Sequence, residues 1–162
     1  MVDTAKAEIE GDTRLIVTRD FAAPPERLFH ALTAPDILPQ WMVGPPGWTL
    51  TVETMDWRPG GTYNWLYQEP SSGNWFAFTG EVRGYDPPHG FICTQAYDPG
   101  NMGVTMGAEM LVEHAITAMD TGARLRVTMS FATAEDRAAA MATGMTDGME
   151  MSYAALDGLL VA

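Results

Sequence analysis

Residues 133–162, TAEDRAAAMATGMTDGMEMSYAALDGLLVA, form the long segment of the chain that has a helical period. Apolar side chains recur at steps of four, four, three and four, which places them on one face of a helix. Gly144 and Gly148 interrupt this face, and a glycine inside a helix costs about 1 kcal/mol relative to alanine. We therefore expect close approach of another backbone, or space left for a bound molecule, at these glycines. The apolar face consists of Met145, Met149, Tyr153, Leu156 and Leu160.

The sequence before this helix changes to a period of two, which predicts antiparallel strands. A short helix opening at Pro24 and Pro25 and one or two helical turns at residues 33–42 interrupt the series after its first strand. The resulting order, β-α-α-β6-α, predicts an α+β fold in which a curved sheet wraps the final helix. Residues 1–12 are expected to be a flexible acidic tail and residues 13–162 a single domain. The seven predicted strands are residues 14–21, 48–57, 62–68, 75–85, 91–97, 108–117 and 123–132.

Two hairpins have a register that follows from their turns. The hairpin of strands three and four places bulky side chains on one face, as does the hairpin of the last two strands, where His114 is the single polar member. The expected pairs are Tyr63 with Gly80, Trp65 with Phe78, Tyr67 with Phe76, Val112 with Met129, His114 with Val127 and Ile116 with Leu125.

The fifth strand does not resolve in this way. A loop centred near residues 101–103 would place Cys93 opposite Glu113 and His114 opposite Ile92. In that register the thiol and the imidazole face opposite sides of the sheet. A slip of one residue would reverse the orientation of Cys93.

Composition limits the kinds of partner. The chain of 162 residues has 21 acidic and 9 basic residues, a net charge of −12, which argues against nucleic acid and anionic membranes as partners. No apolar run approaches the roughly 20 residues that span a bilayer, and the polar N-terminus lacks the apolar core of a signal peptide. A single cysteine, Cys93, excludes an internal disulfide and fits a cytoplasmic location.

Four blocks in order resemble one known family. They are RDFAAPPERLFHALTAPDILPQW at residues 19–41, DWRPGG at 56–61, FTGEV at 78–82 followed by DPP at 86–88, and GMTDGME at 144–150. This series resembles the START-like (SRPBCC) superfamily, in the branch related to the C-terminal domain of the activator of Hsp90 ATPase. The resemblance extends from about Arg14 to Leu160.

The resemblance implies a helix-grip fold, in which seven antiparallel strands grip the last helix over a hydrophobic cavity. The superfamily includes lipid, hormone and polyketide binders, aromatase/cyclases and co-chaperone modules, and a fold does not fix a function. One position departs from the family pattern. Met149 stands where the family usually has a tryptophan, so we expect a larger or more adaptable cavity.

The first functional hypothesis is binding of a hydrophobic or aromatic small molecule, lipid-like or polyketide-like, between the sheet and the last helix. Aromatic and methionine side chains suit such a site, although the same residues would also serve as ordinary core packing. No cofactor is expected, and a homodimer is possible. The predicted ligand-binding residues are Trp41, Tyr63, Trp65, Phe76, Phe78, Met110, His114, Met129, Met141, Met145, Met149 and Tyr153.

Two alternatives remain open. The first is a cyclase/aromatase-type enzyme using the same cavity, with His114 as the candidate catalytic residue and Tyr63 and Tyr97 as further proton-transfer groups. A structural histidine in the core would explain His114 equally well. The second alternative is a co-chaperone-like module for an Hsp90-type ATPase. A thiol nucleophile formed by Cys93 with His114 is disfavoured by the expected register, and three scattered histidines do not suggest a metal site.

Overall fold

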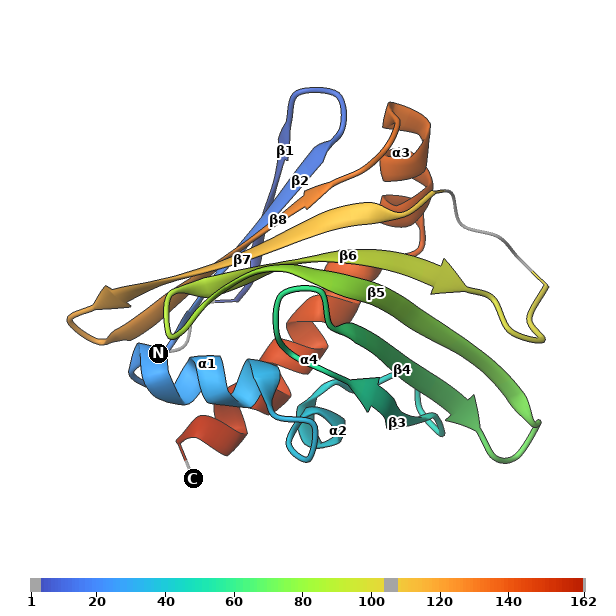
Figure 1. The fold of residues 1–162 in the computed structure, drawn as a ribbon, viewed down its shortest axis with the longest axis horizontal. Helices are drawn as coiled ribbons and strands as arrows, with labels where there is room; N and C mark the ends of the chain where they lie inside the picture. The colour runs from blue at the N-terminus through green and yellow to red at the C-terminus, as the bar shows by residue number, and fades with distance from the viewer. Residues whose placement is uncertain (1–3, 104–107, 162) are drawn as a thin grey trace.

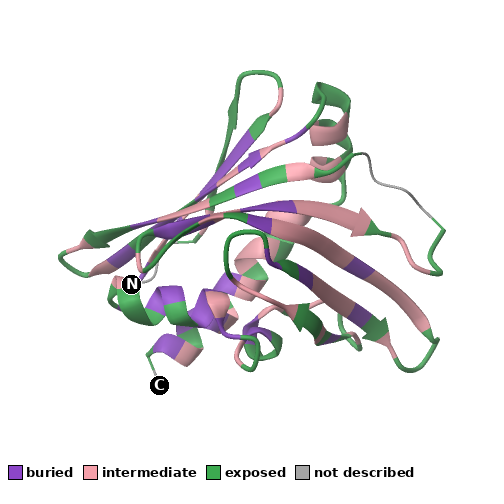
Figure 2. Ribbon diagram, in the orientation of Figure 1, coloured by how far each residue is buried: buried purple, intermediate pink, exposed green. Residues whose placement is uncertain are grey.

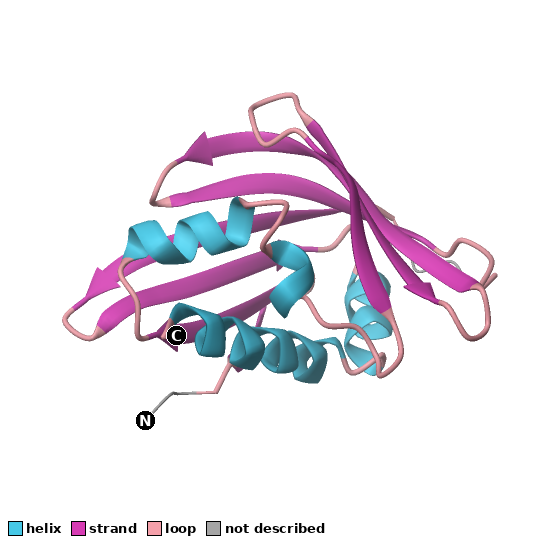
Figure 3. Ribbon diagram, turned by 90° about the horizontal axis from the view of Figure 1, so that it is seen from below, coloured by secondary structure: helices cyan, strands magenta, loops and turns pink. Residues whose placement is uncertain are grey.

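The computed structural model describes residues 4–103 and 108–161. One large sheet is covered on one face by helices, so the molecule has two layers (Figures 1 and 3). The N-terminal half of the chain supplies two short helices, and the C-terminal end supplies two more. The elements are β1 (Lys6–Glu10), β2 (Arg14–Phe21), α1 (Pro25–Thr33), α2 (Leu38–Trp41), β3 (Thr49–Met55), β4 (Thr62–Glu69), β5 (Asn74–Asp86), β6 (Gly90–Asp98), β7 (Met110–Met119), β8 (Gly122–Ser130), α3 (Ala134–Ala142) and α4 (Met145–Leu160).

The sheet confirms the antiparallel layout, but it has eight strands in the described residues where seven were predicted. Their order is β1-β2-β8-β7-β6-β5-β4-β3, so β1 and β3 form the edges. The additional strand, β1, lies in the stretch predicted to be a flexible tail. Ala7 and Ile9 alternate with charged residues, a short strand pattern that the prediction missed, although all five side chains are exposed. Backbone pairing with β2, from Lys6 opposite Thr18 to Glu10 opposite Arg14, holds it in place.

The two predicted hairpin registers are confirmed. In β4 and β5, Trp65 lies opposite Phe78, and in β7 and β8, His114 lies opposite Val127. Bulky side chains of these four strands therefore share the face that packs against the helices, which we call the inner face.

The register of β6, which the sequence left open, differs by one residue from the one that a loop centred near residues 101–103 would give. Cys93 lies opposite Val112, and His114 lies opposite Phe91. That alternative required a symmetric turn near residues 101–103, whereas β6 ends at Asp98 and β7 begins only at Met110. A connection of that length does not determine a register. As a result Cys93 and His114 share the inner face.

The first two helices follow the prediction. Helix α1 buries the four apolar residues on its inward side, and α2 ends at Trp41. The indole Nε1 of Trp41 donates a hydrogen bond of 3.0 Å to the carbonyl of Ala31, which ties the two helices together. The buried residues of α1 are Leu28, Phe29, Ala31 and Leu32.

The C-terminal run forms two helices and not the single helix that was predicted. The chain breaks after α3 because Gly144 adopts a left-handed conformation with φ of 78°. The hydroxyl of Thr143 donates to the carbonyl of Ala140 at 2.6 Å and closes the end of α3. Of the two alternatives for Gly144 and Gly148, close approach of another backbone is wrong, because a Cβ at either position would meet nothing within 4 Å.

Burial is uneven across the two layers. Helix α1, α2 and the C-terminal half of α4 cover the most buried part of the inner face, whereas the far ends of β5 and β6 are half-buried (Figure 2). Helix α4 itself changes from half-buried methionines near its start to the buried Tyr153, Leu156 and Leu160. In the described residues, no helix is both long and apolar enough to cross a membrane.

Candidate functional site

Aromatic side chains form a continuous surface on the inner face of β4, β5 and β6. Strand alternation directs them all toward the helices, because their positions differ by two residues along each strand. Tyr67 stacks on Phe76 with ring centroids 5.1 Å apart, Phe76 lies 5.9 Å from Phe78, and Phe78 lies 5.7 Å from Tyr97. Phe76, Phe78 and Tyr97 are only half-buried, so this surface is partly open.

The last two helices contribute methionines to the helical layer. Met141 of α3 and Met145 and Met149 of α4 are half-buried and pack against the core. Unbranched thioether side chains adapt their shape to a neighbour more easily than leucine or tryptophan does. The core therefore has a rigid aromatic part on the sheet and a more deformable methionine part on the last two helices.

The predicted ligand-binding residues separate into two groups by burial. Trp41 and Tyr153 stack on each other with centroids 6.3 Å apart, and both are buried. Tyr63 and Met129 are equally buried, so these four contribute to the core. The half-buried members are Trp65, Phe76, Phe78, Met110, His114, Met141, Met145 and Met149.

The enclosed cavity between sheet and α4 stays a prediction. Two surface grooves are described, and neither is lined by the predicted ligand-binding residues. One crosses the outer face of β3 to β6, and the other lies where residues 22–25 approach residues 118–122.

Among the residues that the structure describes, three buried nitrogen atoms on the helix side of the sheet lack a hydrogen-bond partner. They are Nε1 of Trp57, Nε1 of Trp65 and Nδ1 of His114. Leaving a buried polar group unpaired costs about 1–3 kcal/mol, so native proteins rarely keep several together. Their rings form one connected cluster. Trp57 lies 6.1 Å from Trp65 and 5.2 Å from Phe91, and Phe91 stacks on His114 at 4.3 Å.

His114 lies on the inner face, as predicted. Burial lowers the pKa of His114 to about 4, because the charged imidazolium would lose its solvation there. The side chain is therefore neutral at pH 7, with one nitrogen able to donate and the other able to accept. Such a group can anchor a ligand or accept a proton.

Burial makes two other candidate reactive groups, Cys93 and Tyr63, harder to deprotonate. Burial raises the pKa of the Cys93 thiol to about 11, so it is not a thiolate nucleophile near neutral pH, even though it shares a face with His114. The hydroxyl of Tyr63 donates a hydrogen bond of 2.5 Å to the carbonyl of Thr94. Burial also raises the pKa of Tyr63 well above its ordinary value, so its proton is not readily transferred.

A buried ionic cluster beside this region was not predicted from the sequence. Arg19 is 4% exposed, and its guanidinium donates to the carboxylate of Glu150 at 3.1–3.2 Å. Asp157 lies 3.7 Å from the same guanidinium, and the backbone N–H of Ala5 donates to Glu150 at 3.1 Å. The signal was present in the sequence, because Arg19 occupies an inward position of β2 in the series Leu15, Val17, Arg19 and Phe21.

A metal site has no support from side-chain clustering. Within residues 4–103 and 108–161, no three histidine, cysteine, aspartate or glutamate residues are grouped so that they could hold a metal ion.

Comparison with known proteins identifies relatives of the whole chain. The family model described as "Activator of Hsp90 ATPase homolog 1-like protein" matches residues 22–161. A crystal structure of a Rhodobacter sphaeroides protein is 33% identical, covers 98% of this chain and 99% of its own, and has a TM-score of 0.89. Protein Ms6760 from Mycobacterium smegmatis is 26% identical over 99% of this chain and 97% of its own, with a TM-score of 0.83.

More distant structures share the fold alone. Protein CV1439 from Chromobacterium violaceum is 23% identical over 91% of this chain and 97% of its own, with a TM-score of 0.74. No curated protein matches the chain.

Proposed function

Because the chain belongs to the activator of Hsp90 ATPase homolog 1-like family, whose START-type fold often binds small hydrophobic ligands, we propose that it binds a hydrophobic or aromatic small molecule. The ligand occupies the space between the aromatic surface of β4 to β6 and the methionines of α3 and α4. The observation that carries the proposal is that the aromatic side chains of the inner face and the methionines of α3 and α4 are half-buried and pack against the same core. Half-buried rings and thioethers gain stability when a ligand removes their remaining surface from water.

The unpaired indole nitrogen atoms indicate which polar groups the ligand carries. The indole groups of Trp57 and Trp65 can only donate hydrogen bonds, and both lack an acceptor within residues 4–103 and 108–161. A ligand that carries a carbonyl, carboxylate or phenolic oxygen beside its apolar part would satisfy them. Lipids and aromatic polyketides both have this combination of groups.

Ligand-induced stabilisation tests the proposal. The purified protein is heated with single members of a panel of fatty acids and aromatic polyketides, and the melting temperature is recorded. A ligand at 100 times its dissociation constant stabilises the folded state by about 2.7 kcal/mol. If no panel member raises the melting temperature, the proposal is wrong for these ligand classes.

A matched pair of variants locates the binding surface. Met149→Trp introduces a broad ring on the half-buried side of α4, and Met151→Trp introduces the same ring on the exposed side, where Met151 is 57% exposed. We expect Met149→Trp to change the rank order of ligands and Met151→Trp to leave it unchanged. Equal effects of the two substitutions would show that this side of α4 does not contact the ligand.

A second substitution tests the hydrogen bond. Trp65→Phe keeps an aromatic ring but removes the Nε1 donor, which has no protein partner to lose. We expect weaker binding of a fatty acid and unchanged binding of a hydrocarbon of equal length. Equal loss for both ligands would show that Trp65 contributes packing alone.

An enzyme of the cyclase/aromatase type remains the second candidate, supported by the neutral imidazole of His114 and its unpartnered Nδ1. The hydrogen-bonded Tyr63 does not support it. The family match does not distinguish either candidate from a co-chaperone role. Once a ligand is found, chemical change of that ligand on incubation with the wild-type protein but not with His114→Leu would favour the enzyme.

A further inference from the structure

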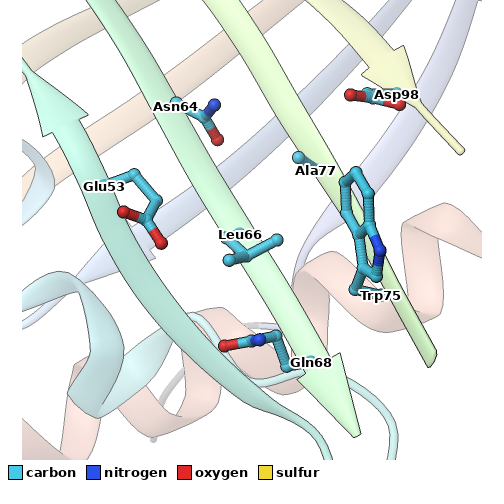
Figure 4. Close-up of a pocket in the computed structure, with 7 residues that line it drawn as sticks. All are labelled: Glu53, Asn64, Leu66, Gln68, Trp75, Ala77 and Asp98. Atoms are coloured by element: carbon cyan, nitrogen blue, oxygen red, sulfur yellow. The ribbon is translucent and has the colours of Figure 1, made fainter. Parts of the chain in front are cut away.

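A groove crosses the outer face of the sheet, on the side opposite the helices (Figure 4). Its volume is about 380 Å³, and four neighbouring strands contribute to it. Asn64, Leu66 and Gln68 alternate along β4 with residues that face the helices, so the sheet itself separates this groove from the ligand site proposed above. The lining residues are Glu53 of β3, Asn64, Leu66 and Gln68 of β4, Trp75 and Ala77 of β5, and Asp98 of β6.

The groove presents hydrogen-bond acceptors and negative charge. Glu53 and Asp98 contribute carboxylates on opposite sides, and Asn64 contributes a buried Oδ1 that has no hydrogen-bond partner. None of the seven lining residues is basic. The floor between the two carboxylates consists of Leu66 and Ala77, which are apolar. This pattern suits a ligand with positively charged ends and an apolar middle.

The side of the groove formed by Trp75 and Asp98 is held in position by the loop after β6. Gly100 packs so closely on the indole of Trp75 that a Cβ there would lie 2.6 Å from the ring. The backbone N–H of Trp75 donates to Oδ1 of Asn101 at 2.8 Å, and Asp98 accepts from the backbone N–H of Gly100 at 2.9 Å. The loop therefore fixes both an aromatic ring and a carboxylate before any ligand binds. Tryptophan is the side chain that attracts cations most strongly through its ring face.

The carboxylates of Glu53 and Asp98 lie too far apart to bind one metal ion together. Glu53 and Asp98 belong to strands three neighbours apart, so their backbones are separated by about 14 Å at the usual strand spacing of about 4.8 Å. Oxygen ligands of one Ca²⁺ or Mg²⁺ ion must lie about 2.0–2.6 Å from it. A cation that contacts both carboxylates must therefore be an extended organic molecule.

We propose that this outer groove binds a linear polyamine. One ammonium group pairs with Glu53, another pairs with Asp98 beside the ring of Trp75, and the alkyl chain lies over Leu66 and Ala77. A further ammonium group, between the two that pair with the carboxylates, donates to Oδ1 of Asn64. This site is independent of the hydrophobic ligand on the inner face.

Titration with spermidine, followed by nuclear magnetic resonance, tests the proposal. We expect saturable shifts of the indole N–H of Trp75 and of the side-chain amide of Asn64. Glu53→Gln and Asp98→Asn should each weaken spermidine binding about threefold to fivefold, as expected for partly exposed ion pairs and a cation–ring contact. Asp98→Asn keeps an oxygen that can accept from Gly100, so the loop is retained.

The control is Glu8→Gln on β1, at the opposite edge of the sheet. It removes the same charge from the chain but lies far from the groove, so its spermidine affinity should equal that of the wild type. An equal loss in Glu8→Gln and Glu53→Gln would overturn the proposal, because it would show general attraction to an acidic protein. Saturation of the same shifts by Mg²⁺ at equal concentration would also overturn it.

Discussion

At the scale of single residues, His114 is the side chain with the most unusual electrostatic state. It is stacked on Phe91, it lies opposite the apolar Val127, and its Nδ1 has no partner. The pKa of about 4 means that the folded protein holds this histidine neutral until the solution is distinctly acidic. In the unfolded chain the same group would gain a proton near pH 6.5.

This difference predicts a loss of stability in acid. Between pH 6.5 and 4 the unfolded chain binds a proton at His114 that the folded chain does not, so the free energy of unfolding falls as the pH falls. The shift corresponds to a loss of up to about 3 kcal/mol. His114→Leu should lack this part of the decline, as measured by urea unfolding at pH 7, 5.5 and 4.

His30→Gln provides the control, because His30 is exposed. Its unfolding free energy should follow the pH dependence of the wild type. If the difference between the wild type and His114→Leu is the same at all three pH values, His114 does not titrate below its ordinary range.

At the scale of elements, the break between α3 and α4 depends on one glycine conformation. Gly144 has φ of 78°, where an L-residue with a Cβ is strained, whereas Gly148 lies inside the helix α4. Neither position is crowded, because a Cβ at either would meet nothing within 4 Å. The two glycines therefore differ in backbone conformation alone.

The same substitution should consequently have opposite effects at the two positions. Gly144→Ala should lower the free energy of unfolding by about 1–2 kcal/mol, because alanine resists the left-handed conformation. Gly148→Ala should raise it by about 0.5–1 kcal/mol, because alanine favours the helix. Chemical denaturation of both variants measures the difference. A stabilised Gly144→Ala variant would contradict the helix break.

The strands also show how much of the fold can be predicted from the sequence alone. Short turns and alternating bulky residues fixed the pairing of β4 with β5 and of β7 with β8 in advance. The strand β1 was missed although Ala7 and Ile9 alternate with charged residues, because the pattern covers only five residues and buries none of them. The register of β6 could not be predicted because a long connection leads to β7.

The candidate site was predictable to a similar extent. Strand alternation correctly predicted that Trp65, Phe78 and His114 point inward, because successive side chains of a strand point to opposite faces of the sheet. The unpaired state of the indole nitrogens depends on which groups surround them in three dimensions. The same holds for the groove on the outer face, where residues of four strands meet.

At the scale of the whole molecule, Arg19 joins three separate parts of the chain. It extends from β2 to Glu150 and Asp157 of α4, and Glu150 in turn accepts from the backbone of Ala5 before β1. The guanidinium also lies 4.9 Å above the ring of Phe21. Sheet, final helix and N-terminal segment therefore meet at one nearly buried charge.

Removing this charge should weaken the entire fold. Arg19→Met leaves Glu150 and the buried Asp157 without their cation, which is expected to lower the free energy of unfolding by about 3–5 kcal/mol. Arg14→Met removes the exposed partner of Glu10, in a pair about half exposed on both sides, and should cost less than about 1 kcal/mol. Thermal and urea unfolding compare the two variants. Similar losses would mean that the cluster contributes no more than a surface pair.

The burial gradient along α4 has a consequence for how such a chain can diverge. Replacing a fully buried residue such as Leu156 by alanine costs about 2–5 kcal/mol, a large share of the stability of a small domain. Met145 and Met149 are half-buried, so substitutions there remove fewer contacts. Descendants of this sequence can therefore vary the first half of the helix and acquire new ligand preferences while the second half continues to preserve the fold.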